Sequence, residues 1–303
     1  MQQNHEEWRR EGSAVNAGIP RLEANLFNAA FALYLLAIVA YVAFAGTRHR
    51  AVAALASGIG WLGLLAHTAS LVARSVAAGR VPYVSMYEYL LAFAWAIVVV
   101  FLVLRTRAGA RREAVDSAGA VVFTLVAGLL GYGSKLPTEM KQIEALMPIL
   151  KSNWLIFHIL TAVVGYGAAG VAAAMSFLYC ALNIVPGGER IKARLPSATA
   201  LDWASYRCVL FAFPFLALLN ITGAIWAYDA WGRWWGWDPK ETWSLITFMV
   251  YLFYLHARLR AGWQGVKVNA VVLVGFVAVM FTFIGVNRLA AFSQSLHSYA
   301  SPG

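Results

Sequence analysis

The chain has 303 residues, of which 61% are hydrophobic and only 13% are charged. Soluble domains carry about 25% charged residues, so this composition excludes an ordinary soluble enzyme and indicates a polytopic membrane protein. The formal net charge of +10 is typical of basic cytoplasmic loops, and we expect a lipid bilayer but no nucleic acid as a partner. The two cysteines form no CxxC pair, which argues against a disulfide framework, a thiol-redox motif and a zinc or iron–sulfur site.

Eight apolar segments are long enough to cross a bilayer, which takes roughly 20 helical residues. Residues 1–24 precede them, are polar, and are expected to form an external tail. We therefore predict an all-α, polytopic fold with about eight transmembrane helices. Four helices lie within 25–133, an external loop follows at 134–153, and a core at 154–303 ends in an external tail. The eight candidate spans are 25–46, 51–73, 86–104, 116–133, 154–184, 205–226, 243–260 and 268–290.

Lysine and arginine concentrate in every second loop between these segments. The basic loops lie near 48–50, 105–112, 190–194 and 258–267, whereas the loops between them mix acidic and basic residues. Basic loops face the cytoplasm in most membrane proteins. We therefore expect both termini, the loop after the fourth segment and the loop after the sixth segment to lie outside the membrane.

A dense aromatic stretch lies between the sixth and seventh segments, within 226–243. Its glycines and proline would break a helix, and its charges are costly in a membrane core, so we predict a short structured loop or interfacial helix. Several indole faces together form an apolar platform, which suits a large planar ligand. The alternative is the aromatic belt of a membrane interface, but a belt explains only one or two tryptophans per helix end. Trp226 opens this stretch, and the tryptophans of its 231–243 part are Trp231, Trp234, Trp235, Trp237 and Trp243.

Four charged residues are embedded in the 231–243 part of this loop. Asp238 and Glu241 are expected to cap the following helix, because acidic groups are favoured at a helix N-terminus. Arg233 and Lys240 could pair with acidic groups of a ligand. Alternatively, the two carboxylates neutralise these charges locally, and the sequence leaves both interpretations open.

Two histidines are candidates for a site beside the aromatic loop. His158 lies in the first turns of the fifth segment and His297 follows the last segment, so the predicted topology places both outside. Imidazole is a common axial ligand of haem iron, and the two histidines with the platform make a candidate bis-histidine haem site. The alternative is two unrelated histidines at the interface.

Two further histidines lie within the predicted spans. His256 is about 20 Å along a helix from Trp243, towards the cytoplasmic side, and could belong to a second site inside the membrane. Arg258 would then face acidic groups of the ligand or lipid phosphates. The alternative is an interfacial histidine beside a basic turn. For His67, in the second segment, we favour a polar contact between helices over a ligand.

The sequence WWGWDPKETW at 234–243 resembles the tryptophan-rich WWD signature of haem-handling proteins. The order of His158, this motif, His256 and His297 further resembles the CcsA (ResC) family of System II cytochrome c biogenesis. Residues 82–88 are also similar to a stretch of that family. The length and the eight predicted spans resemble CcsA more than the shorter CcmC or the longer CcmF.

This resemblance implies a haem-handling core at 154–303 that contains a WWD loop at 226–243. In the family, the positions of His158 and His297 ligate haem b (iron protoporphyrin IX) outside the membrane, and the position of His256 binds it within the membrane. The loop residues then expected to contact the cofactor are Trp231, Arg233, Trp234, Trp235, Trp237, Asp238 and Trp243.

The resemblance also implies partners and a location. A separate CcsB (ResB)-like membrane protein supplies the other membrane ligand, and the substrate is an apocytochrome c with a CxxCH motif. The chain would be part of a holocytochrome c synthase in the bacterial plasma (inner) membrane, with no catalytic residue assigned. Two other functions stay open. One is a haem transporter or exporter without ligation activity. The other is a di-haem electron-transfer subunit, for which only His67 and His256 could supply a facing pair.

Overall fold

The computed structural model describes residues 2–143, 150–184 and 196–288, with side chains from residue 19 onward. All regular elements in these ranges are helices, which confirms the predicted all-α class. The long helices are α1 (Gln2–Thr47), α2 (Arg50–Ala78), α3 (Met86–Arg107), α5 (Gly119–Ser134), α6 (Asn153–Ile184), α8 (Ala198–Trp231), α9 (Pro239–Leu259) and α10 (Val266–Met280). The shorter pieces are α4 (Arg112–Ser117), 3-10 turns at Gly109–Arg111 and Glu139–Lys141, a π-helical turn at Phe281–Gly285 and α11 (Val286–Arg288).

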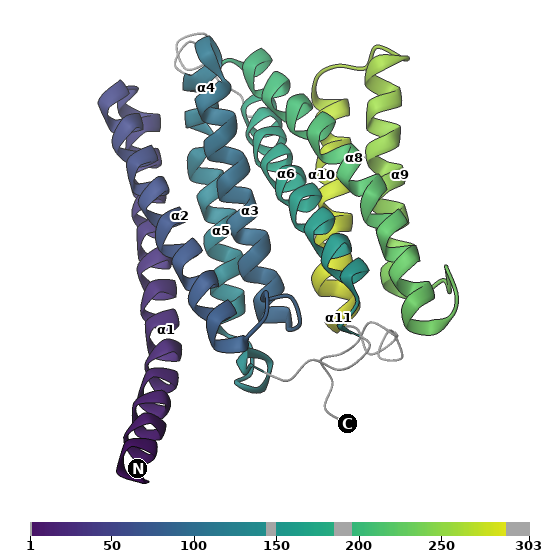
Figure 1. The fold of residues 1–303 in the computed structure, drawn as a ribbon. Coiled ribbons are helices and arrows are strands. Elements are labelled where there is room, and N and C mark those ends of the chain that lie inside the picture. The colour runs from purple at the N-terminus through teal and green to yellow at the C-terminus, as the bar shows by residue number, and fades with distance from the viewer. Residues whose placement is uncertain (1, 144–149, 185–195, 289–303) are drawn as a thin grey trace.

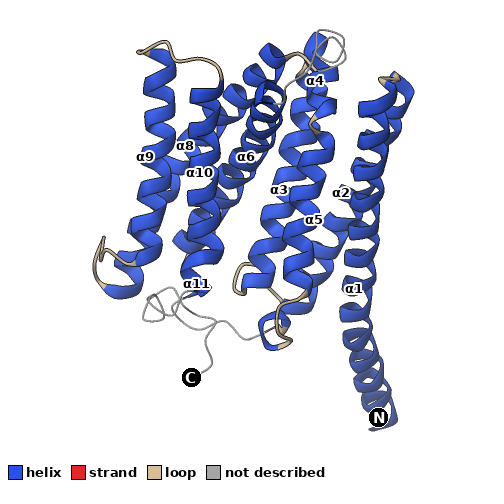
Figure 2. Ribbon diagram, turned by 180° about the vertical axis from the view of Figure 1, so that it is seen from behind, coloured by secondary structure: helices blue, strands red, loops and turns tan. Residues whose placement is uncertain are grey.

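The long helices run alternately between the same two ends of the molecule, as Figure 1 shows and Figure 2 shows from behind. The α2–α3 turn, the start of α6 and the α8–α9 loop lie at one end. The turns at 48–49, 108–111 and 260–265 lie at the other end. The basic loops near 48–50, 105–112 and 258–267 are thus separated from the aromatic loop by the full length of the helices, and the basic loop near 190–194 lies outside the described residues.

Helices occupy all eight expected spans within the described residues. Six of them are long and apolar enough to cross a membrane, and a seventh is counted when two helices bent by 52°, Gly109–Ser117 and Gly119–Ser134, form one span. Helix α9, which covers the segment expected at 243–260, is not among these. Its charged ends and its many tyrosine, tryptophan and hydroxyl side chains lower its hydropathy. Helix α1 begins at Gln2, so the expected tail at 1–24 is helical from that residue.

The first helices pack around an aromatic cluster. Tyr41 of α1 stacks on Phe123 of α5 with ring centroids 5.7 Å apart, and Phe101 of α3 meets Phe123 edge-on at 5.8 Å. Small residues then bring α3 against α6, because a Cβ added at Gly167 would lie 2.7 Å from the Cβ of Ala96. Close approach through small residues is the usual way in which membrane helices pack. This contact joins the first helices to the pair formed by α6 and α8.

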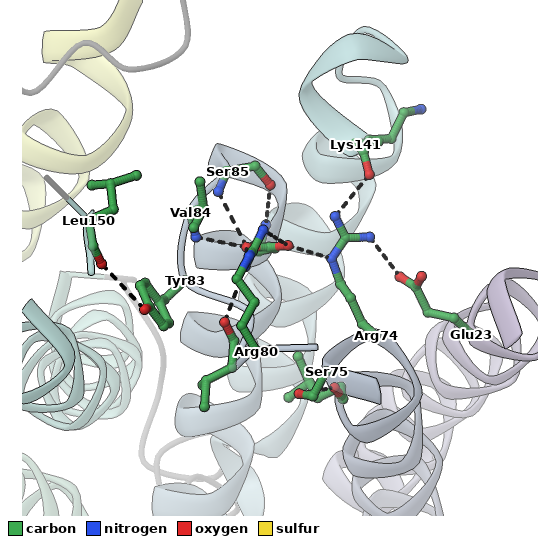
Figure 3. A network of polar contacts seen from close by, with 12 residues as sticks. Glu23, Arg74, Ser75, Arg80, Tyr83, Val84, Ser85, Lys141 and Leu150 are labelled. Carbon is green, nitrogen blue, oxygen red and sulfur yellow. Dashed lines mark hydrogen bonds and ion pairs between the residues drawn. The ribbon is translucent and has the colours of Figure 1, made fainter. Parts of the chain in front are cut away.

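A buried ion-pair network ties the first helices together at the end where the aromatic loop lies. Arg74 of α2 donates to Glu23 of α1 at 3.1 Å, to Glu88 of α3 at 2.9 Å and to the carbonyl oxygen of Lys141 at 2.9 Å. Figure 3 shows Arg74 between Glu23 and Lys141. Arg80 also donates to Glu88, at 2.9 Å. Glu88 is fully buried by these partners.

The same network shapes the turn that leads into α3. Oε2 of Glu88 accepts the backbone N–H of Val84 at 2.7 Å, and Ser85 and Glu88 form a capping box at the start of α3. Tyr83 adds a hydrogen bond to the carbonyl oxygen of Leu150, at 3.5 Å, just before α6. The network therefore fixes a short segment, 83–86, between the first helices and α6.

Candidate functional site

A large cavity opens where α3, α6, α8, α9 and the last helical turns meet. Its volume is about 1260 Å³ when the solvent space at its open mouth is included. Most of its wall is aliphatic or aromatic, with a few polar groups. The lining includes Val84, Met86, Tyr89, His158, Asn220, Gly223, Trp226, Trp235, Lys240, Glu241 and Asn287. The wall therefore suits a largely apolar molecule with a few polar groups.

His158 is the imidazole in this wall. It comes from the second turn of α6, and its Nδ1 lies 3.0 Å from the carbonyl oxygen of Leu219 in α8. The indole of Trp226 lies nearly parallel to its ring, at 20° with centroids 6.2 Å apart. Gly223 faces the same ring, since a Cβ there would come within 2.9 Å of Nδ1. Helix α8 thus holds the imidazole at the cavity wall.

The aromatic loop is shorter than expected. Helix α8 continues to Trp231 and ends at Gly232, whose φ of +70° suits glycine, and α9 begins at Pro239. The non-helical part of the expected 226–243 loop is therefore 232–238. Within it, Trp237 has a φ of +57°, an uncommon conformation for a bulky side chain.

The tryptophans of this region do not form one flat surface. Trp235 lines the cavity, and Trp237 meets it edge-on at 5.8 Å while remaining 70% exposed. Trp234 stacks on Tyr228 outside the cavity wall, with centroids 4.7 Å apart. Trp243 packs on Phe281 at 4.2 Å. Among the described residues, the cavity wall therefore receives Trp235 from the loop and Trp226 from α8.

The capping prediction for the acidic residues agrees with the geometry. Asp238 is the N-cap of α9 and accepts the backbone N–H of Lys240 at 2.9 Å. Glu241 completes the capping box and also accepts the N–H of Gly236 at 2.8 Å. Both carboxylates are thereby used to hold the loop and the start of α9. Asp238 is buried and is not among the residues that line the cavity.

The two basic residues of the loop differ in position. Arg233 is exposed and folds over Gly236, where an added Cβ would lie 2.7 Å from its guanidinium carbon. Lys240, in the first turn of α9 ahead of the 243–260 segment, lines the cavity. Burial lowers the pKa of Lys240 to about 8, and the charge of Asp238 opposes this shift. Lys240, and not Arg233, is the basic side chain at the cavity wall.

The site residues expected from the sequence include none from α3, although this helix forms part of the cavity wall. Met86 and Tyr89 of α3, and Val84 just before it, line the cavity. For Val84 and Met86 the signal in the sequence is the resemblance of residues 82–88 to a family stretch, and Tyr89 lies just beyond that stretch. An apolar side chain does not itself reveal which neighbour it faces. Asn220 and Asn287 add polar groups to the wall and carried no signal.

His256 lies far from this cavity along α9 and faces outward. It is exposed, together with Ile246, Met249, Phe253 and Leu259 on the same side of the helix. Arg258 faces inward instead. It donates to Asp202 of α8 at 2.9 Å and lies over the ring of Tyr206 at 4.5 Å. The expectation that Arg258 faces a ligand bound at His256 is therefore wrong, because Asp202 takes its charge.

The remaining two candidate histidines are His67 and His297. His67 is completely buried, and its Nδ1 lies 3.2 Å from the hydroxyl of Tyr34, between α2 and α1. This is the interhelical contact that we favoured. His297 lies outside the described residues.

Comparison with known proteins gives a consistent assignment. The profile of the Cytochrome C assembly protein family matches residues 83–293. The cytochrome c biogenesis protein CcsA of Synechococcus elongatus is 33% identical, over 92% of this chain and 97% of its own length. The CcsA proteins of Gloeobacter violaceus and Chlamydomonas reinhardtii are 32% and 35% identical, over 92% and 76% of this chain and 96% and 64% of their own lengths.

One solved structure has a similar fold. The structure described as Cytochrome c Heme Lyase CcmF aligns with a TM-score of 0.69, over 88% of this chain and 46% of that chain. Its sequence is 16% identical, so the likeness shows the fold alone. The family match covers all the walls of the cavity, and the curated relatives match most of the chain. The chain therefore belongs to the CcsA family of cytochrome c biogenesis proteins.

Proposed function

We propose that this chain binds haem b in the cavity and presents it for covalent attachment to apocytochrome c, as the WWD subunit of a CcsA–CcsB synthase. The observation that carries the proposal is the placement of His158, Trp235 and Lys240 around one large apolar cavity. Haem is here the substrate that is handed on. The two expected external ligands of its iron are His158 and His297.

The described residues fit this substrate. A porphyrin is broad and apolar, and the aliphatic and aromatic wall would bury its faces. The imidazole of His158 supplies a nitrogen ligand of the kind that haem iron takes. Lys240 supplies a cation for a propionate carboxylate. The exposed Trp234, Trp237 and Arg233 lie in the same loop, where they would contact the substrate edge or the incoming apocytochrome.

The chemistry asks for orientation more than for an unusual catalytic group. Each thioether bond forms when an S–H group of the CxxCH motif adds across a vinyl double bond, without a leaving group or a change in total electrons. Holding the vinyl edge beside two thiols supplies the proximity that such an addition needs. The chain would serve this step by fixing the haem plane through His158 and by excluding water with the apolar wall.

The exposed face of α9 is the proposed binding surface for the partner protein. An unsatisfied imidazole in hydrocarbon is costly, so an outward-facing His256 on an apolar helix face calls for a neighbour. A CcsB-like membrane protein docked there would cover this face and supply a second ligand for haem at His256. Asp202 and Arg258 would hold α9 in place from the opposite side.

The proposed location is the bacterial plasma membrane, with the cavity on its external side. The support is that the basic loops within the described residues lie at the end remote from the aromatic loop. In this orientation both termini lie outside.

Co-expression with a CcsB-like partner and a CxxCH reporter tests the function. Covalent haem on the reporter, lost in His158→Ala, supports the synthase. Haem delivered without covalent attachment supports a transporter, and a haem pair that reacts with quinol supports electron transfer. The last alternative is disfavoured, because His67 on α2 and His256 on α9 belong to helices at opposite edges of the molecule in both views.

A further inference from the structure

We infer that Gly223 and the carbonyl group of Leu219 form a seat on α8 that fixes the ring orientation and tautomer of His158. Both act as positioning residues, and the inference rests on the proposed role of His158 as an iron ligand. The seat is a property of the α6–α8 contact.

The geometry of the seat is specific. Nδ1 of His158 lies 3.0 Å from the carbonyl oxygen of Leu219. This carbonyl lies one helical turn before Gly223, and a carbonyl oxygen has two lone pairs, so it can accept from the helix and from the imidazole together. A Cβ at residue 223 would lie 2.8 Å from Cε1 and 2.9 Å from Nδ1 of His158. Glycine is therefore the one residue at 223 that leaves this edge of the ring in place.

The hydrogen bond also determines the tautomer. A carbonyl oxygen only accepts, so Nδ1 must carry the proton. The lone pair of the neutral ring is then on Nε2, which becomes the nitrogen that can ligate iron. A histidine ligand that donates its other N–H to a carbonyl is oriented by that bond and becomes more basic. The Leu219 carbonyl thus selects the ligating nitrogen and strengthens it.

Further contacts between α6 and α8 lie beside this seat. Thr161 donates to the carbonyl oxygen of His158 at 2.8 Å and lies 3.4 Å from the hydroxyl of Thr222. Two turns further along α6, a Cβ at Gly165 would lie 3.2 Å from the Leu216 side chain. Small residues at 165 and 223 therefore let α6 and α8 approach closely enough for the ring to reach the carbonyl.

The first test compares Gly223→Ala with Gly128→Ala in the complex with the CcsB-like partner. Gly128 is the matched control, because nothing lies within 4 Å of a Cβ added there. In Gly223→Ala we expect the absorption of six-coordinate low-spin haem at the external site to change to that of five-coordinate haem. Added imidazole should restore the low-spin spectrum, because a free ligand replaces the displaced ring. Gly128→Ala should keep the original spectrum.

Two results would contradict the proposed role of Gly223 and Leu219. One is that Gly223→Ala shows the same low-spin spectrum as the unchanged complex. The other is that Gly223→Ala loses haem and added imidazole does not restore it. If His158→Ala also keeps that spectrum, the proposed ligand itself is wrong, so the two failures are distinguishable. A second measurement needs no variant. Nitrogen-15 NMR of histidine-labelled, haem-free protein should show His158 with its proton on Nδ1, and a proton on Nε2 would contradict the inference.

Discussion

Arg258 and Asp202 form an ion pair that joins α9 to α8, with Nη1 and Oδ1 2.9 Å apart. Asn269 of α10 donates to the same carboxylate at 2.8 Å. His256, two positions before Arg258, is exposed on the other side of α9. One helix thus carries a structural polar contact on its inner face and a candidate ligand on its outer face.

Because the two faces of α9 differ, we predict that substituting Asp202 lowers stability and that substituting His256 lowers haem content. Asp202→Ala should destabilise the chain by about 1–3 kcal/mol, because it removes hydrogen bonds to a charged group and leaves Arg258 without its carboxylate. His256→Ala should leave the thermal unfolding temperature unchanged but abolish membrane haem in the complex. Thermal unfolding and haem content of the purified complexes measure both. Normal haem at the membrane site in His256→Ala would exclude this histidine as a ligand.

Glu88 offers a sharper test of the buried network. Glu88→Ala leaves Arg74 and Arg80 buried beside an empty carboxylate position, and breaking a buried pair of this kind costs about 3–5 kcal/mol. Glu113→Ala is the control, because that side chain is 67% exposed in a 3.8 Å pair with Arg48, and exposed pairs contribute about 0–1 kcal/mol. Of these two variants, only Glu88→Ala should therefore show a markedly lower thermal unfolding temperature. Equal unfolding temperatures for the two variants would contradict the structural role of the network.

Haem affinity should depend on pH through Lys240. Below its pKa of about 8 the ammonium group is present and can pair with a propionate. Above that pH, binding requires proton uptake, so the affinity should fall by up to about tenfold per pH unit. Lys240→Gln should bind more weakly and lack this pH dependence, whereas exposed Lys135→Gln should behave as the unchanged chain. Haem titrations at pH 7 to 9 measure this dependence of affinity on pH. Identical affinities at each pH for the unchanged chain and Lys240→Gln would rule out the pairing of Lys240 with a propionate.

The orientation can be checked by thiol labelling. Ser134 and Gln264 are exposed at opposite ends of the helices, and the native Cys180 and Cys208 are buried. Ser134→Cys should react with an impermeant reagent in intact cells, and Gln264→Cys only after permeabilisation. The reverse pattern would place the cavity on the cytoplasmic side.

Apolar runs predicted where the helices lie and their order along the chain, whereas the orientation expected from the loop charges stays a prediction. A run of 20 apolar residues almost requires a helix in a membrane, and breakers such as Gly232 end it. The capping roles of Asp238 and Glu241 were equally predictable, because a cap acts on its own neighbours along the chain. These features depend on local sequence.

The rotation of each helix about its axis could not be predicted in this way. When most of a helix is apolar, its pattern does not reveal which side faces a cavity, a neighbour or lipid. For that reason the α3 wall with Tyr89, the inward turn of Arg258 and the separation of Arg233 from the cavity emerged only from packing. The seat beneath His158 likewise depends on a glycine in a different helix.

The most direct test of the central claim is the visible absorption spectrum of the purified complex with and without His158→Ala. With His158 present, we predict low-spin haem at the external site, and in His158→Ala we predict loss of that signal and its partial return with added imidazole. The variant should still be inserted and should still hold haem at His256. An unchanged low-spin spectrum in His158→Ala would contradict the claim that this cavity binds haem through His158.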